Sequence, residues 1–178
     1  MRPRNDLIIR SAASCDAAVI ARIYAPFVSD TAVTFDEEIP TAAAMSHKID
    51  DIVKMYPFLV AQQGDQIVGY AYASPFRPRA SFRWTVEVTV YVNAANQRQG
   101  IGRSLYEVLL PTLTKHGFVT AYAVITLPGL ASVAMHEAFG FKRIAVFQKV
   151  GFKLGQWHDV GYWERRLNTP TANPAEPE

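Results

Sequence analysis

The chain has 178 residues, and its 18 Lys and Arg against 16 Asp and Glu give a formal net charge of +2 at pH 7. This length predicts one domain, and the small charge without a basic run argues against a nucleic-acid partner. The one cysteine, Cys15, excludes an intramolecular disulfide and a cysteine-based zinc site. We expect a cytoplasmic protein with no membrane partner, because the N-terminus lacks a signal peptide's apolar core and no apolar run reaches about 18 residues.

Hydrophobic periodicity predicts alternating strands and helices over residues 1–167, which we interpret as a single domain. Strands are expected at 7–10, 58–61, 67–73, 86–92, 119–126, 141–149 and 160–167, with 151–159 connecting the last two. Helices are expected after Ser14 as N-cap, after Pro40-Thr41, from Ile101 and over 130–138, with Pro111 bending or ending the third. This order predicts a mixed sheet with helices packed on its faces, an α/β (α+β) architecture. The Pro-, Ala-, Thr- and Glu-rich tail, 168–178, is expected to be disordered.

The central stretch runs from a strand through a polar turn into a helix. Valines alternate with polar residues up to Val92, and helical spacing begins at Ile101, with Gly100 and Gly102 at the joint. Glycines allow close backbone approach, and the free N–H groups of a helix start attract anions, so this corner predicts a phosphate cradle. It matches neither the Rossmann fingerprint, because Leu105 replaces the third glycine, nor the P-loop.

Two motifs carry a resemblance to a known family. The run Gln97-Arg98-Gln99-Gly100-Ile101-Gly102 resembles the Gln/Arg-x-x-Gly-x-Gly/Ala signature of GNAT acetyltransferases, which holds the pyrophosphate of acetyl-CoA. The segment 129–141 resembles the family's later helix motif, but Gly129 stands where the family usually has an Asn that contacts the cofactor. Within the family, the chain resembles the phosphinothricin/L-amino-acid N-acetyltransferases through Thr34-Phe35, Arg77-Pro78-Arg79, Thr85-Val86-Glu87, Ser132 with His136-Glu137, and Trp157-His158-Asp159-Val160.

The resemblance implies the GNAT fold over residues 7–167, a mixed and mostly antiparallel central sheet with helices on both faces. It also implies acetyl-CoA as cofactor and a homodimer. The implied cofactor contacts are Val90, Tyr91, Val92, Gln97, Arg98, Gln99, Gly100, Ile101, Gly102, Arg103 and Ser132. The histidines His47, His116 and His158 show no metal-ligand pairing, and we assign no metal.

Acetyl transfer to an amine requires a neutral amine, and Glu87 is our candidate base because a mid-strand carboxylate is costly unless paired or working. The alternative is an ion pair between Glu87 and Arg83 on the same face. Backbone N–H groups of residues 90–92 would stabilise the oxyanion if the strand splays from its neighbour. His136 is either the acid that protonates the thiolate or a packing residue.

The substrate side is predicted from charge and aromatic content. Arg77 and Arg79 would bind the acid group of the acceptor, unless they only form a solvated loop. Phe35, Tyr91, Trp157 and Tyr162 would wall the acceptor pocket or pack in the core. We therefore predict direct transfer from acetyl-CoA to the α-amine of a small amino acid or analogue. The alternatives are another amine, such as a polyamine, an antibiotic or a protein N-terminus, and a non-catalytic acyl-CoA sensor.

Overall fold

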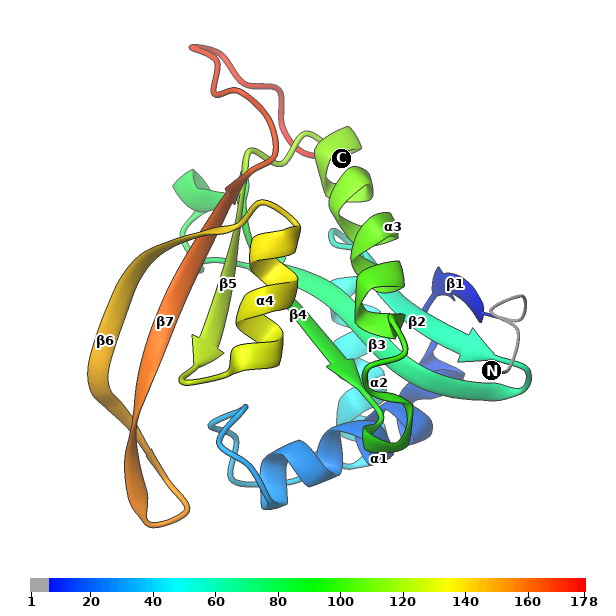
Figure 1. The fold of residues 1–178 in the computed structure, drawn as a ribbon. Helices are drawn as coiled ribbons and strands as arrows, with labels where there is room; N and C mark the ends of the chain where they lie inside the picture. Colours follow the sequence, from blue (N-terminus) through cyan, green and yellow to red (C-terminus); the bar gives the residue numbers. More distant parts are fainter. Residues whose placement is uncertain (1–6) are drawn as a thin grey trace.

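The computed structural model describes residues 7–178, and they form one seven-stranded sheet in the order β1-β2-β3-β4-β5-β7-β6 (Figure 1). The β4–β5 pair is parallel, and the other neighbouring pairs are antiparallel. The predicted mixed, mostly antiparallel sheet is thereby confirmed. The strands are β1 (Leu7–Ser11), β2 (Phe58–Gln63), β3 (Gln66–Pro75), β4 (Thr85–Val92), β5 (Thr120–Thr126), β6 (Lys142–Lys153) and β7 (Gln156–Arg166).

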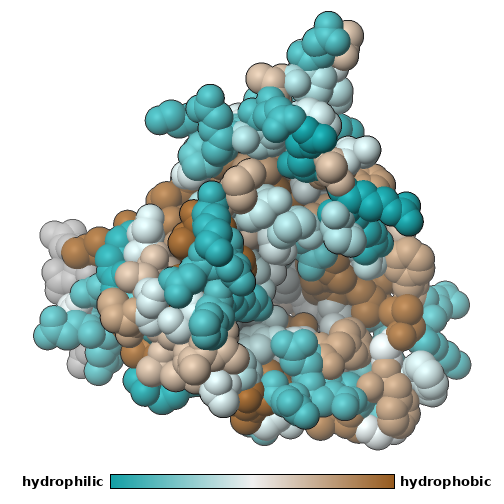
Figure 2. Space-filling model, turned by 180° about the vertical axis from the view of Figure 1, so that it is seen from behind, coloured by the Kyte–Doolittle hydropathy of each residue, from teal (hydrophilic) through white to brown (hydrophobic). Residues whose placement is uncertain are grey.

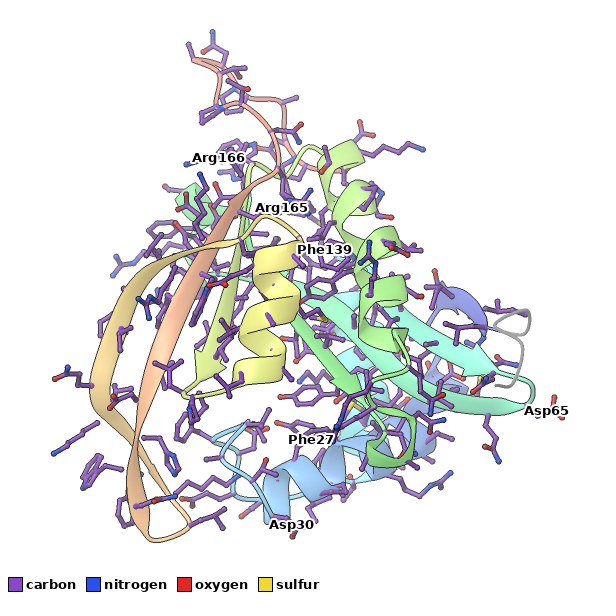
Figure 3. The ribbon with its side chains drawn as sticks, in the orientation of Figure 1. Phe27, Asp30, Asp65, Phe139, Arg165 and Arg166 are labelled. Carbon is purple, nitrogen blue, oxygen red and sulfur yellow. The ribbon has the colours of Figure 1, made fainter. Side chains whose placement is uncertain are left out.

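Helices cover both faces of the sheet, as predicted. The helices are α1 (Ala17–Ser29), α2 (Ala42–Ile52), α3 (Ile101–Lys115) and α4 (Leu130–Ala138). One apolar core joins the even-numbered β4 valines to α3, and a second joins α1 and α2 to Tyr70 and Tyr72 of β3. Phe27 of α1 points toward the end of β4, where its ring lies 4.9 Å from that of Tyr91, and Phe139 follows α4 on the side that faces α3 (Figure 3).

The structure corrects three predictions of local structure. Ser14 does not cap the first helix: it begins a 3₁₀ turn, and Asp16 accepts the backbone N–H of Ala13 at 2.9 Å. Pro111 does not end α3, because Leu109, Leu110 and Leu113 are buried and their packing offsets the lost hydrogen bond. The other predicted effect, a bend at Pro111, stays a prediction. Most of the expected 151–159 connection is strand.

The last two strands form a long hairpin, residues 142–166, which we call the arm (Figure 1). Its turn is only Leu154-Gly155, both at positive φ. The polar residues and glycines of 151–159 interrupt the hydrophobic alternation of a strand, so the sequence predicted a connection there.

The parallel pair β4–β5 is short, and this feature creates the cavity. The register joins only residues 85–87 of β4 to residues 120–122 of β5. Beyond Glu87 the two strands diverge, and in Figure 1 they open on the side where α4 and the arm lie. The splay that the oxyanion prediction required is therefore present.

The tail after β7 has neither helix nor strand. Trp84 Nε1 donates to the carbonyl of Ala175 at 2.7 Å, and the N–H of Glu178 donates to the carbonyl of His116 at 3.1 Å. These contacts lie at the end of the sheet opposite the opening between β4 and β5, so the tail stays outside the cavity.

Candidate active site

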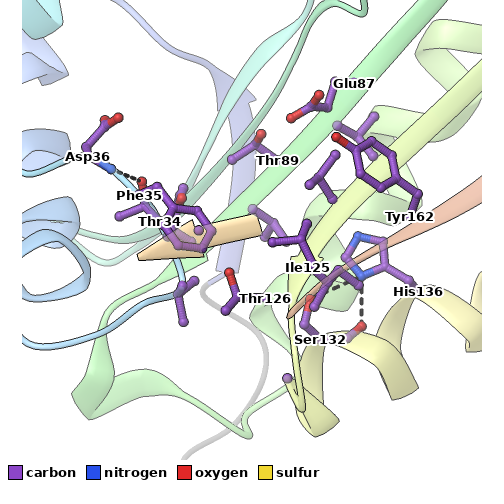
Figure 4. A pocket seen from close by; sticks show the side chains of 18 of the residues that line it. Thr34, Phe35, Asp36, Glu87, Thr89, Ile125, Thr126, Ser132, His136 and Tyr162 are labelled. Atoms are coloured by element: carbon purple, nitrogen blue, oxygen red, sulfur yellow. Dashed lines mark hydrogen bonds between the residues drawn. The ribbon is translucent and has the colours of Figure 1, made fainter. Parts of the chain in front are cut away.

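A cavity of about 680 Å³ lies in the splay between β4 and β5. Its walls come from α1, the α1–α2 loop, α2, β3, β4, β5, α4 and the arm, and Figure 4 shows part of them. From behind, the surface is hollowed in this region and apolar side chains gather beside the hollow (Figure 2). The predicted residues that the structure brings together here are Phe35, Glu87, Val90, Tyr91, Ser132, His136 and Tyr162.

Glu87 faces this cavity from the last β4 position that pairs with β5. Burial raises the pKa of its carboxyl group, and the positive charge of Arg77 opposes that rise. The alternative ion pair with Arg83 is wrong. Arg83 precedes the strand, donates to the carbonyl of Ala80 at 2.8 Å and pairs with Glu176 of the tail. The described chain gives Glu87 no salt bridge, so its carboxylate is free to take a proton.

The backbone of β4 offers unpaired groups to the cavity. The N–H of Asn93 donates to the carbonyl of Val68 on β3 at 2.9 Å. Because hydrogen-bonded pairs alternate along an antiparallel ladder, odd-numbered residues of β4 bond to β3. Val88, Val90 and Val92 therefore direct their N–H and C=O groups toward the β5 side. Past the paired segment these groups face the opening, as an oxyanion site requires.

The loop before α3 has the backbone geometry of an anion cradle. Arg98 has φ +59° and Gly100 has φ +84°, so two positive-φ positions are separated by one residue. Turns that alternate in this way form the concave set of N–H groups called a nest, which binds anions. Gly100 occupies the N-cap of α3 and no side chain caps the helix, which leaves the first-turn N–H groups available. These features fit the pyrophosphate of acetyl-CoA.

The side chains around this cradle have separate roles. Ile101 is buried in the core and can contribute only its backbone. Gly102 serves close packing, because a Cβ there would lie 3.0 Å from the sulfur of Met135. Arg103 pairs with Glu107 at 2.9 Å, while the exposed amides of Gln97 and Gln99 fold back on local carbonyls at 3.4 Å.

His136 lies on the cavity wall but is only 3% exposed. Its Nδ1 lies 2.8 Å from the carbonyl of Ser132 (Figure 4). Its Nε2 lies 3.0 Å from the hydroxyl of Tyr106. With Nδ1 protonated, Nε2 accepts from the buried tyrosine. Burial lowers the pKa of His136, which favours this neutral form. Donation to a thiolate would require the ring to break one of these bonds, and the Ser132 hydroxyl stands beside it.

Gly129 fits its own position better than asparagine would. It has φ +43°, and a Cβ there would lie 2.6 Å from the carbonyl oxygen of Thr126. The geometry of this turn therefore requires glycine at position 129, where the family usually has asparagine.

The arm and the α1–α2 loop clamp Phe35 between them. A Cβ on Gly151 would lie 2.1 Å from the Phe35 ring, so only glycine admits this contact. Lys153, 7% exposed, donates to the carbonyl of Thr34 at 2.8 Å. From the other side, Tyr24 binds the Thr34 hydroxyl at 2.6 Å. Phe35 is thereby fixed as a wall of the cavity.

Some predicted residues lie elsewhere, and some lining residues escaped prediction. Arg77 and Arg79 follow β3 and do not line the cavity, although Arg77 acts electrostatically on Glu87. Trp157 is 60% exposed on the arm and lies outside the cavity. The lining residues that the sequence did not reveal include Tyr24, Asp36, Lys48, Tyr72, Val150 and Phe152. Alternation along β3 could have assigned Tyr72 to one face of the sheet, the face that it shares with Glu87. Nothing in the sequence indicated which helix covers that face.

Residues 7–178 contain no group of three or more His, Cys, Asp and Glu side chains placed to hold a metal ion. Within the same residues, no helix has the length and apolar character needed to cross a bilayer.

The fold, the splayed strands and the cradle define an acetyltransferase of the GNAT superfamily, and the chain belongs to that family: the acetyltransferase (GNAT) domain matches residues 9–161. It is 37% identical to a phosphinothricin N-acetyltransferase of Streptomyces viridochromogenes, over 94% of this chain and 91% of that protein. It is 32% identical to an L-methionine sulfoximine/L-methionine sulfone acetyltransferase of Salmonella typhimurium, over 95% and 99%. Among solved structures, a phosphinothricin acetyltransferase of Sinorhizobium meliloti in complex with acetyl-CoA superimposes with a TM-score of 0.89 at 32% identity, covering 95% of each chain.

Proposed function

We propose that this acetyltransferase moves the acetyl group of acetyl-CoA directly to the α-amine of a small amino acid or analogue of the phosphinothricin and methionine sulfone type. The observation that carries the proposal is the free, half-buried carboxylate of Glu87 at the point where β4 and β5 separate. A binding protein without turnover has no use for such a base. The names of the relatives support the acceptor class.

The chain's residues divide the chemistry. Acetyl-CoA supplies a thioester, and the nest at Arg98 and Gly100 with the start of α3 would hold its pyrophosphate. Glu87, directly or through water, removes a proton from the acceptor ammonium so that its lone pair is free to attack. The N–H groups of Val90 and Val92 donate to the carbonyl oxygen as negative charge develops there.

The acceptor would lie on the Glu87 side of the cavity. Phe35 forms one wall, and Arg77 and Arg79 stand beyond Glu87, where we propose that they attract the acceptor's carboxylate. His136 is held on the cavity wall by its hydrogen bond to Tyr106. We propose that His136 or the neighbouring Ser132 faces the departing thiolate.

The test is release of free coenzyme A from acetyl-CoA in the presence of L-amino acids, methionine sulfone, methionine sulfoximine and phosphinothricin. Acetylation of the α-amine, identified by mass spectrometry, supports the proposal. Turnover with polyamines or peptide N-termini but not with amino acids would contradict the acceptor class. Tight acetyl-CoA binding without release of thiol for any amine would contradict an enzymatic role.

We further propose a homodimer that acts in the cytoplasm. Exposed apolar side chains on the arm support the dimer, because a monomer rarely leaves such a row uncovered. These residues are Ile144, Val146, Phe147, Val150, Phe152, Leu154 and Trp157. The lone, reduced Cys15 is compatible with a reducing compartment. Light scattering of the wild type and of Phe147→Lys would test the dimer, and equal masses would contradict this surface.

A further inference from the structure

The cavity has a second charged wall that the proposed chemistry does not use. Lys48 of α2 places Nζ 3.0 Å from the hydroxyl of Tyr72, which accepts its hydrogen bond, and 4.8 Å from the centre of that ring. Both residues line the cavity, and in the described chain Lys48 is its only lining lysine or arginine. The site therefore has a cationic group on the wall formed by α2 and β3.

Lys48 forms no salt bridge with a carboxylate of residues 7–178. The salt bridges within residues 7–178 join other pairs, including Lys54 with Asp51 on the same helix. An ammonium has three donors, and the Tyr72 hydroxyl takes one of them. Two donors remain for water or for an anion that enters the cavity.

The register of the sheet places Tyr72, the hydrogen-bond partner of Lys48, relative to Glu87. Tyr72 lies opposite Thr89, two residues along β4 from Glu87, and two residues of strand span roughly 7 Å. Arg77 follows the opposite end of this pairing, beyond Pro75 and Val86. Along the two strands the order is therefore Lys48 in the cavity, then Glu87, then Arg77 beyond the cavity lining. Asp36, the other carboxylate of the lining, is engaged by the hydroxyl of Tyr24, which donates to it at 2.7 Å.

This order is complementary to one class of acceptor. We propose that the acceptor is an α-amino acid whose side chain ends in an anionic oxyacid group, a phosphinate or carboxylate, and that Lys48 binds this group and sets specificity. The α-carboxylate faces Arg77, the amine faces Glu87, and the side chain runs past Thr89 to Lys48. This inference rests on the proposed function and refines its acceptor. It distinguishes phosphinothricin, with an anionic phosphinate, from methionine sulfone, whose side-chain oxygens carry no net charge.

The experiment compares kcat/KM for phosphinothricin and for methionine sulfone in the wild type and in Lys48→Gln. We expect the phosphinothricin-to-sulfone ratio to fall about three- to thirtyfold in the variant, mainly through KM for phosphinothricin, because a partly exposed ammonium–anion contact lies between a surface and a buried one. Lys48→Arg should retain the preference, and Lys48→Glu should lower the ratio further. Lys115→Gln, an exposed lysine of α3 outside the cavity, is the matched control.

Each outcome separates the two proposals. A ratio in Lys48→Gln within twofold of wild type overturns the role of Lys48, and so does an equal loss for both acceptors. A wild-type enzyme that favours the sulfone over both phosphinothricin and L-glutamate also overturns it. If the wild type acetylates no amino acid at all, the proposed function itself fails. Thermal melting reports whether each variant is folded, and the comparison is made only between variants that melt as the wild type does.

Discussion

Replacement of Glu87 by Gln removes a base while preserving the size and shape of the side chain. Positioned general bases typically contribute about 10²–10⁴-fold, so kcat near neutral pH should fall by that factor. The affinity for acetyl-CoA, measured by calorimetry, should change little, because the cradle lies at the start of α3 and the carboxylate faces the acceptor. Raising the pH should restore part of the rate in the variant, because solvent then deprotonates the amine.

The stability of Glu87→Gln should change in the opposite direction to its activity. Burial raises the pKa of Glu87 in the folded state. A raised pKa contributes stability that is fully present below the unfolded pKa of about 4.3 and lost as the pH rises through the folded pKa. Glutamine does not ionise, so the variant does not lose this stability as the pH rises. The Tm of the variant relative to that of the wild type should therefore increase from pH 4 to pH 7. If the ionised Glu87 carboxylate instead stabilised the fold, the Tm of the variant relative to wild type would decrease from pH 4 to pH 7.

The assay is kcat/KM against pH for wild type, Glu87→Gln and Glu164→Gln. Glu164 is the control because its carboxylate accepts from Tyr122 at 2.7 Å and is engaged outside the cavity. The wild-type profile should lose activity on the acid side as the Glu87 carboxylate is protonated, at a pH above the usual range for glutamate. Parallel profiles within threefold of each other for wild type and Glu87→Gln would refute the assignment of Glu87 as the base.

Three further predictions concern the cofactor and acceptor sites. Gly102→Val should raise the Kd for acetyl-CoA, because its Cβ would meet Met135 at 3.0 Å and push the start of α3 away; calorimetry showing wild-type affinity in a folded variant contradicts this. Gly151→Ala should raise the acceptor KM and leave that of acetyl-CoA unchanged, because Phe35 must move, and Phe35→Leu in the same chain should recover part of the loss. Arg77→Ala should raise the acceptor KM about ten- to a hundredfold and move the acid side of the profile to higher pH, since the Arg77 charge opposes the raised pKa of Glu87; discrimination between an amino acid and its amide that equals wild type would count against it.

The sequence by itself determined the order of the elements and the family, and it predicted an anion cradle at the start of α3. Strand alternation up to Val92, helical spacing from Ile101 and glycines at the joint are local signals, and local signals act over a few residues of backbone. The same locality explains the errors. Ser14 is a good cap by type, but the N-cap position of α1 falls at Asp16, whose carboxylate is held by Arg10 of β1 at 2.7 Å and does not cap the helix. Pro111 disfavours a helix locally, yet the buried leucines around it keep α3 intact.

Only the tertiary structure decided what surrounds Glu87. Its separation from Arg83, the divergence of β4 from β5, and the meeting of Lys48 with Tyr72 all depend on contacts between residues distant in the chain. The clamp on Phe35 joins Thr34 to Lys153, 119 residues apart. Periodicity assigns a side chain to a face of its own strand or helix, but the packing of other elements against that face selects its neighbours. The cavity beside Glu87 is lined by such neighbours, so its charge pattern became visible only in three dimensions.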